Sequence, residues 1–417
     1  MPPRKLQITV PPFFRCPISL ELMKDPVTLC TGLTYDRESI EKWFQEGHST
    51  CPASMQVVES NPELLPNHTL RRLIQEWCVA NQSKGVERIP TPKPPAELHQ
   101  VKALLSEIDQ KANKNVAALK RLRSMAKESE RNRLCLVEAG AISILSGFLS
   151  CFDEAGDKDS LEMVEACEEA IATLALLSLD SAVKKQTVGA SQICSIAFIL
   201  RRGSLEGKVN AALLLHSLAE GEDSFKLIMG EQRDLITGLV GLLREDLYRR
   251  AVKASLMALL AIVTPRKNRL RIVEAGAVPV LIELLPEATV RNTEIILAII
   301  EILCNTAEGR AAVTRHALAI PVLVAILRAV SDLATDHAVG ILWAISQTAP
   351  DKSTMQAAVH EGAFTQLLYV IQADSTAVTK QKSADLLKRL HHFWRDDPCS
   401  PDNAAGGRLI THNLPLI

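Results

Sequence analysis

The chain has 417 residues, of which 47% are hydrophobic and only 4% aromatic, and its formal net charge at pH 7 is −1. This length predicts two or three domains, and an apolar fraction rich in Leu, Ala, Ile and Val is typical of helices packed on helices. The near-zero net charge argues against binding to nucleic acid or to a charged membrane surface.

Ten cysteines are scattered without a framework spacing, which favours free thiols in a reducing compartment over disulfides. Residues 1–10, an expected N-terminal arm, contain no apolar signal-peptide core, and no apolar run approaches the roughly 18 residues of a membrane span. We therefore expect a soluble protein without integral membrane contact, located in the cytoplasm, with the nucleus as an alternative.

Residues 11–82 have the layout of a small zinc domain that lacks its metal ligands. Cys16-Pro-Ile-Ser19 and Cys51-Pro-Ala-Ser54 each place a serine where a second ligand would stand, and a neutral hydroxyl is a poor donor to Zn²⁺. The nearby His48 and His68 cannot complete two four-ligand sites. We predict no metal and no cofactor, and we expect polar side chains to hold the loops instead, namely those of Cys16, Ser19, Asp25, Asp36, Cys51 and Ser54.

Short strands are predicted over residues 27–31 and 33–35, joined by a tight hairpin at Gly32. Asp36 is expected to supply an N-cap oxygen for a helix over residues 37–46. The sequence therefore predicts a small α+β unit in this part of the chain.

A second helix is predicted after Asn67, which is a favourable N-cap residue. Its apolar side chains recur at i, i+3, i+4, i+7 and i+8; they are Leu70, Leu73, Ile74, Trp77 and Cys78. The two helices and the hairpin would share one core. A unit of this length is near the lower size limit for a domain without disulfides or a metal site.

The run CPISLELMKDPV, followed by TGLTYDRESIEKWF, a Cys-Pro step and LLPNHTLRRLI, closely resembles the U-box, the zinc-free relative of the RING domain. The resemblance runs through residues 13–81. It implies a domain that holds a ubiquitin-charged E2 (ubiquitin-conjugating) enzyme. By position, the E2 would be bound by Ile18, Leu20, Trp43 and Pro52.

Trp43 is open to two interpretations from the sequence. It shares a helix face with Ile40 and Phe44, so periodicity alone leaves core packing and a partly exposed anchor equally open. The resemblance favours the anchor, and exposed aromatic anchors commonly dominate interface energies.

No catalytic nucleophile is expected on this chain. Covalent transfer would need an exposed, activated thiolate beside a base, and the four cysteines of the unit are expected to be buried and structural; they are Cys16, Cys30, Cys51 and Cys78. Catalysis would then consist of holding the charged E2 and the substrate lysine together.

Met55 departs from the family pattern. Many active RING and U-box domains carry at this position a basic or amide side chain that bridges E2 and ubiquitin, and a thioether cannot donate a hydrogen bond. Arg71 and Arg72 are expected instead to pair with acidic neighbours, namely Glu21, Asp25 or Glu76. Two alternatives therefore stay open, a non-catalytic adaptor with a degenerate U-box and a zinc-dependent RING.

Residues 83–96 contain four prolines, which favours a stiff, extended connector. From residue 97 to residue 395 the sequence repeats itself. Residues 272–285 echo residues 136–149, and weaker copies end at Leu200, Leu243, Leu327 and Ile371, so that successive copies end 42 to 51 residues apart. A period of about 40–47 residues belongs to armadillo and HEAT arrays.

The U-box, the connector and the repeats together resemble the plant U-box/armadillo E3 ubiquitin ligases, of the kind that restrain immune and stress signalling. The expected fold is mainly α, a small zinc-free RING-like α+β domain followed by an armadillo-type right-handed α-solenoid. The implied partners are an E2, ubiquitin and a protein substrate in the solenoid groove, and a U-box dimer is a further option. On this groove we expect Glu168, Asn210, Lys253, Asn292 and His337 to be exposed.

The chain is expected to end in a capped array. A polar loop is predicted at residues 151–159, where one repeat interval is longer than the others. The last helix, over residues 379–394, would present a polar outer face formed by Lys380, Lys382, Lys388 and Arg389. Residues 396–417 are expected to form a flexible tail.

Overall fold

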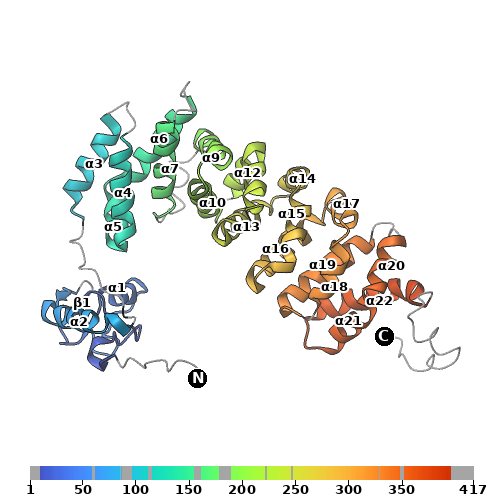
Figure 1. The fold of residues 1–417 in the computed structure, drawn as a ribbon, viewed down its shortest axis with the longest axis horizontal. Coiled ribbons are helices and arrows are strands. Elements are labelled where there is room, and N and C mark those ends of the chain that lie inside the picture. The colour runs from blue at the N-terminus through green and yellow to red at the C-terminus, as the bar shows by residue number, and fades with distance from the viewer. Residues whose placement is uncertain are drawn as a thin grey trace. The chain divides into compact units, whose positions relative to one another are not determined.

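The computed structural model describes residues 10–58, 62–84, 86, 96–110, 115–154, 161–177, 189–220, 223–245, 248–327, 329–347 and 352–395. Contacts divide the chain into two units, residues 1–94 and residues 95–417, which are described separately here (Figure 1). Most of the expected arm and connector, residues 155–159 of the expected polar loop, and the whole expected tail lie outside the described residues.

The first unit contains a three-stranded antiparallel sheet in the order β2–β1–β3. Val27 at the centre of β1 pairs with Tyr35 of β2 on one side and with Pro66 of β3 on the other. The elements of this unit are η1 (Pro12–Phe14), β1 (Pro26–Thr28), β2 (Thr34–Asp36), α1 (Arg37–Gln45), β3 (Leu65–Pro66), α2 (His68–Ala80) and η2 (Gln82–Lys84).

The predicted hairpin is confirmed, but its first strand is shorter than predicted. Gly32 has the positive φ of 78° that a tight turn needs. The turn already starts at Leu29, whose N–H donates to the Leu33 carbonyl (N–O 2.9 Å) and whose carbonyl accepts from Gly32 (2.9 Å). These bonds divert the chain from the sheet after Thr28.

Helix α1 begins where predicted, but Asp36 does not cap it through its side chain. Its Oδ1 instead accepts hydrogen bonds from the backbone N–H groups of Lys24 and Asp25, both at 2.8 Å. The carboxylate therefore fastens the segment before β1 to the start of α1. The expected cap was wrong because a distant backbone competes for the same oxygen.

Helix α2 is capped as predicted, since the Asn67 side chain accepts from the Leu70 N–H at 3.0 Å. Ile74 and Cys78 are buried, whereas Leu73 is 47% exposed, so the predicted apolar face is narrower than its spacing indicates. The core of this unit consists of Phe14, Cys16, Met23, Val27, Leu29, Tyr35, Ile40, Cys51, Val58, Ile74 and Cys78.

The second unit is built from helices that repeat in threes, as in the armadillo-type array expected from the resemblance. After α3 (Leu98–Gln110), the described short first helices are α5 (Glu130–Glu138), α11 (Asp223–Glu231), α14 (Arg266–Glu274), α17 (Ala307–Arg315) and α20 (Lys352–His360). The second helices are α6 (Ala141–Glu154), α9 (Ala190–Arg202), α12 (Arg233–Leu243), α15 (Ala277–Leu284) with the short η3 (Leu285–Glu287), α18 (Ala319–Ile326) and α21 (Ala363–Gln372). The third helices are α4 (Val116–Glu128), α7 (Leu161–Leu174), α10 (Leu205–Ala219), α13 (Arg249–Ile262), α16 (Val290–Leu303), α19 (Asp332–Gln347) and α22 (Ala377–Arg395).

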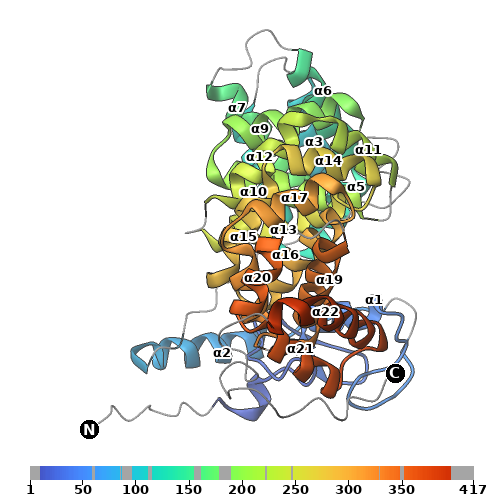
Figure 2. The same ribbon diagram turned by 90° about the vertical axis from the view of Figure 1, so that its right-hand side faces the viewer.

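Helices that occupy the same position in successive repeats pack on each other along the array. The third helices form a continuous series from α4 through α22, and α6, α9, α12 and α15 form another. Figure 2 shows the C-terminal end of this array, where α20, α21 and α22 close it. Because a single helix triplet cannot bury its apolar face alone, the neighbours share one continuous core.

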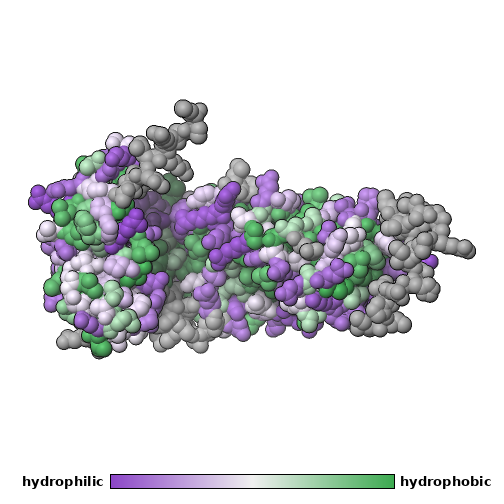
Figure 3. Space-filling model, turned by 90° about the horizontal axis from the view of Figure 1, so that it is seen from below, coloured by the Kyte–Doolittle hydropathy of each residue, from purple (hydrophilic) through white to green (hydrophobic). Residues whose placement is uncertain are grey.

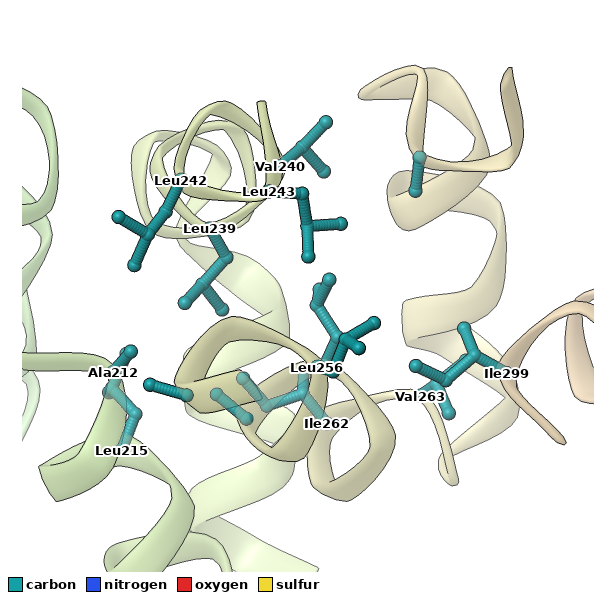
Figure 4. Close-up of a cluster of buried hydrophobic side chains, with 14 of the residues drawn as sticks. Ala212, Leu215, Leu239, Val240, Leu242, Leu243, Leu256, Ile262, Val263 and Ile299 are labelled. Atoms are coloured by element: carbon teal, nitrogen blue, oxygen red, sulfur yellow. The ribbon is translucent and has the colours of Figure 1, made fainter. Parts of the chain in front are cut away.

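The shared core is visible between three neighbouring helices. Leu239 and Leu243 of α12 lie near Leu256 of α13, with Ile299 of α16 on the far side (Figure 4). These four side chains are essentially inaccessible to solvent.

No single helix in the described parts of the chain is long and apolar enough to cross a membrane. Two sharply bent helix pairs meet the criterion for a membrane span by length and composition only.

Glycine makes the step between the first and second helices in three of the repeats. Gly140, Gly276 and Gly362 have φ values of 86°, 79° and 82°, in the left-handed region that a side chain disfavours. Gly189 precedes the second helix of another repeat, but its φ is −122° and its backbone is extended. Its repeat starts the second helix without the left-handed turn.

Candidate functional site

Two loops of the first unit have the same backbone pattern. The first loop, residues 15–22, is closed by an antiparallel bridge between its end residues. Within it, the Cys16 N–H donates to the Glu21 carbonyl and the Leu20 N–H donates to the Cys16 carbonyl, both at 2.8 Å. The second loop, residues 50–57, is built in the same way.

In the second loop the end residues also form an antiparallel bridge. The Cys51 N–H donates to the Gln56 carbonyl and the Met55 N–H donates to the Cys51 carbonyl, again at 2.8 Å each. Each loop therefore closes around its own cysteine through the same set of backbone bonds.

The Cys16 thiol, which is fully buried, is held by hydrogen bonds. Its Sγ accepts from the Asp36 N–H at 3.3 Å. Burial raises the pKa of the thiol, but hydrogen bonds from the backbone of Ser19, Asp36 and Ile18 and from the Ser39 side chain outweigh it, so the pKa is lowered overall.

Cys51 is surrounded by hydroxyl groups. Its Sγ lies 3.1 Å from Tyr35 Oη and 3.4 Å from Thr31 Oγ1, and Ser54 also donates to it. Burial raises the pKa of this thiol, whereas the three hydroxyls and the Ser54 backbone lower it, and the net result is a pKa of about 6. Burial and the bond to Cys51 raise the pKa of Tyr35 to about 12. Tyr35 and Asp36 are adjacent on β2, so this strand holds both loops.

Asp25 connects the segment after the first loop to both helices. Its Oδ2 accepts from Arg37 Nε of α1 at 2.7 Å, and its Oδ1 is bound by the guanidinium of Arg71 on α2. Arg72 pairs with Glu76 at 2.9 Å. The expected pairing of Arg71 and Arg72 with acidic neighbours is confirmed.

Ser19 does not join distant parts of the unit through its side chain. It is exposed, and its Oγ accepts from the Glu21 N–H at 3.4 Å within its own loop. Its hydroxyl was expected to help hold the loops, and this bond lies within the first loop. The backbone of Ser19, by contrast, does bond to the Cys16 thiol.

The buried-cysteine expectation holds for three of the four thiols. Cys16, Cys51 and Cys78 are buried, but Cys30 is exposed. It was expected in a strand, yet it lies in the hairpin turn, because β1 ends at Thr28. In the described parts of the chain no three His, Cys, Asp or Glu side chains are placed to hold a metal ion.

Trp43 joins α1 to the second loop. Its Nε1–H donates to the Thr50 carbonyl at 2.8 Å. Its ring stacks on His48, with ring centres 3.9 Å apart and planes inclined by 21°. The indole is half-buried, so it both packs on the core and keeps an exposed part.

The other residues singled out for E2 binding lie on the two loops. Ile18 is half-buried and packs against the core of the unit, whereas Leu20 is 68% exposed. Pro52 is half-buried at the start of the second loop. Sequence reasoning missed His48, whose position five residues after Trp43, beyond the helix end, matches no helical spacing.

The predicted groove side chains differ in exposure. Lys253 is exposed, and Asn292 is half-buried. Glu168 accepts from the Ser204 N–H at 2.5 Å and from its hydroxyl at 2.8 Å, which fixes the start of α10. Asn210 is only 6% exposed, so its expected exposure was wrong; it belongs to the buried side of α10.

Ion pairs connect successive third helices. Arg123 of α4 binds Glu169 of α7 at 3.1 Å and reaches Glu206 of α10 at 3.5 Å, and Glu206 binds Arg250 of α13 at 3.0 Å. Such bonds span four helices of the array.

In Figure 3, hydrophilic and hydrophobic residues are interspersed over the visible face of the second unit, as suits a protein partner rather than a uniformly charged polymer.

A second polar cluster lies on α16, α19 and α22. Glu301 binds His337 Nδ1 at 2.7 Å and Lys382 at 3.2 Å. Burial raises the pKa of Glu301, but His337 and Lys382 outweigh it and lower the pKa. Lys382 also lies over the Trp343 ring, 5.7 Å from its centre.

The expected polar outer cap on the last helix was partly wrong. Lys382 contacts α16 as described above, and Arg389 donates to the Ser346 carbonyl of α19 at 2.6 Å. Lys388 is exposed and Lys380 half-buried. Their spacing distributes the four side chains around the helix, and because α22 packs along α19, two of them are turned inward.

Family models place these two units. A U-box domain model matches residues 10–83, and a model of the plant U-box protein ARM repeat region matches residues 100–406. The chain belongs to the plant U-box proteins with armadillo repeats. The expected family and fold class are thereby confirmed.

Relatives in Arabidopsis thaliana match nearly the whole chain. U-box domain-containing protein 26 is 41% identical over 406 residues, covering 95% of each chain. E3 ubiquitin-protein ligase PUB23 is 36% identical over 406 residues, covering 95% of this chain and 96% of its own. The name of the second relative agrees with the ubiquitin-ligase interpretation of the sequence.

Solved structures support the fold of the array. An engineered protein aligns with a TM-score of 0.51 at 19% identity, covering 80% of this chain and 82% of its own. A structure from a study of the interaction between cadherin and beta-catenin aligns with a TM-score of 0.61 at 16% identity, covering 79% and 60%. At such identities the likeness concerns the fold alone.

Proposed function

We propose that this protein is an E3 ubiquitin ligase whose U-box docks a ubiquitin-charged E2 on Ile18, Leu20, Trp43 and Pro52, while the armadillo repeats recruit a protein substrate. The observation that carries the proposal is the shape of the U-box. Two loops are held on β2 by hydrogen bonds to their cysteine thiols, and Trp43 fastens the second of them to α1. Exposed apolar side chains on a rigid frame need little ordering to bind.

The chemistry of transfer needs no nucleophile from this chain. The substrate lysine amine attacks the thioester carbonyl that joins ubiquitin to the E2 cysteine, the E2 thiolate leaves, and an amide bond forms. The buried thiols of Cys16 and Cys51 accept hydrogen bonds from Asp36 on β2 and from Thr31 in the hairpin turn, so both serve the scaffold. The ligase accelerates the step by holding both reactants close together.

Replacing Ile18 with alanine is expected to weaken E2 binding about 30-fold, because hot-spot truncations cost about 2 kcal/mol or more. The measurement is titration of purified E2, with autoubiquitination by E1, E2 and ubiquitin as the activity assay. Leu73→Ala is the matched control, since Leu73 is an exposed apolar side chain on α2 outside the proposed face. Equal binding by the Ile18 variant and wild type would contradict the proposal.

His48→Ala is expected to weaken E2 binding less, by about 2- to 12-fold, because stacked aromatic pairs contribute about 0.5–1.5 kcal/mol. Loss of the stack frees the Trp43 indole while its bond to Thr50 remains. His48→Phe keeps a ring at this place and should bind as wild type does. An alanine variant that binds the E2 fully would show that the stack does not position Trp43.

A non-catalytic adaptor is the second candidate. Its supporting observation is Met55, which is 67% exposed on the second loop and offers no hydrogen-bond donor. An adaptor would retain substrate binding by the armadillo repeats yet show no autoubiquitination with any E2. Activity lost in the Ile18 variant but present in wild type would exclude it.

The substrate is proposed to be a protein bound along the third helices from α7 to α22. Regulation of plant defence or stress signalling is supported by the resemblance. Residence in the cytoplasm or nucleus is supported by cysteines that lack a disulfide framework spacing. Proximity labelling in plant cells, comparing the full chain with an Ile18→Ala variant, tests both. Substrates should be labelled by both proteins, and they should accumulate with the variant.

A further inference from the structure

Leu20 and Met55 share an unusual backbone conformation. Their φ values are 61° and 58°, and among the described residues they are the two non-glycine residues with a positive φ. Each lies four residues after the cysteine of its loop, and each donates its N–H to that cysteine's carbonyl at 2.8 Å. The second loop therefore presents Met55 as the first presents Leu20.

Folding of the U-box alone does not explain a methionine at this place. The left-handed region is disfavoured for residues with a Cβ, while glycine and asparagine tolerate it. The hydrogen bond to Cys51 uses only the backbone of residue 55, so any residue except proline could make it. The loop would close at least as well with glycine.

Packing does not explain the side chain either. Met55 is 67% exposed and Leu20 is 68% exposed, so neither fills the core. Both residues expose an apolar side chain although their backbone conformation is energetically unfavourable. Strained backbone positions cluster at functional sites, so these side chains indicate contact with another surface. A thioether chain is unbranched and adapts to irregular apolar surfaces.

The second loop belongs to the same rigid body as the rest of the proposed face. The Cys51 thiol bonds to Tyr35, and the Cys16 thiol bonds to Asp36, which is next to Tyr35 on β2. Trp43 bonds to Thr50 at the start of the second loop. An E2 that covers Leu20 and Trp43 would thus meet a Met55 whose position is already fixed.

We infer that Met55 is a specificity-determining contact of the E2-docking face, the counterpart of Leu20, and that it selects E2 enzymes with an apolar surface at this point. The inference rests on the proposed function. Met55 is then a contact in its own right, and the absence of a donor at this position does not make the U-box degenerate. Loss of the side chain should weaken binding before ubiquitin is attached to the E2.

The test uses the full chain with Met55→Gly, Met55→Asn and Met55→Leu, and the uncharged E2 that gives wild type its highest activity. Glycine and asparagine relieve the backbone, so both variants should melt at or above the wild-type temperature. Both should bind the E2 about tenfold more weakly, whereas the leucine variant should stay within about threefold.

Each other outcome overturns the inference. Full E2 binding by the glycine and asparagine variants would show that the side chain makes no contact. Loss of activity only with ubiquitin-charged E2 would assign Met55 to ubiquitin, and a lower melting temperature would assign it to the fold. Ile18→Ala, measured in parallel, separates the two hypotheses, because a harmless Ile18 variant contradicts the docking face itself.

Discussion

Replacing Asp25 with alanine is expected to destabilise the U-box by about 3 kcal/mol or more. Removing one member of a partly buried ion pair leaves an uncompensated charge. Here both Arg37 and Arg71 lose Asp25, and Arg37 retains only its longer pair with Glu41 at 3.7 Å. Arg71 Nε is already buried without a hydrogen-bond partner. Since a unit of this size has a stability of only a few kcal/mol, most of its molecules should unfold.

Hydrogen exchange of the full chain measures this loss locally. Peptides from α1 and α2 should lose protection in the Asp25 variant, while those from the armadillo repeats should not change. Glu76→Ala is the matched control, because the Arg72–Glu76 pair is exposed and should contribute about 0.5 kcal/mol or less. Equal protection of α1 in both variants would refute the role given to Asp25.

The helices of the array could be predicted because the repeat itself carries the information. Residues 136–149 and 272–285 have the same pattern, and their structures are the same glycine step followed by a second helix. A helix needs only its apolar face and its ends to be recognised, and both are local. The packing of equivalent helices then follows from the period.

Two buried asparagines could have been found in the same repeat. Asn132 and Asn268 occupy equivalent places before the two copies. Asn268 donates to the Lys226 and Ile262 carbonyls, at 2.7 and 2.8 Å, and Asn132 accepts from the Ala96 N–H at 2.9 Å. Extending the comparison four residues upstream would have shown an amide where an apolar residue is expected.

The roles of individual polar side chains could not be predicted, because they depend on partners far along the chain. Asp36 looks like a helix cap but binds the backbone before β1. Lys382 looks like a surface residue but binds Glu301, 81 residues away. Helical spacing fixes the direction in which a side chain points, and only the packed array fixes what it meets.

The pH dependence of U-box stability should reflect the ionisation of the Cys51 thiol. Its pKa is about 6 in the folded chain, against an ordinary value of 9.0. Between these values the unfolded chain binds more protons than the folded one, so the free energy of unfolding rises with pH, by up to about 1.4 kcal/mol per pH unit for one thiol. This stabilisation is fully present above pH 9 and is lost as the pH falls through 6.

Cys51→Ser isolates this contribution, because a serine hydroxyl accepts the same hydrogen bonds but does not ionise. Urea unfolding of residues 1–96, under reducing conditions from pH 6 to pH 9, should give wild-type and variant curves that diverge as the pH rises. Groups common to both proteins cancel in the difference. Cys78→Ser is the matched control, since that buried thiol lies on the apolar face of α2, and its curve should run parallel to wild type. Parallel curves for Cys51→Ser as well would mean that the thiol stays protonated, and that neutral hydrogen bonds alone hold the second loop.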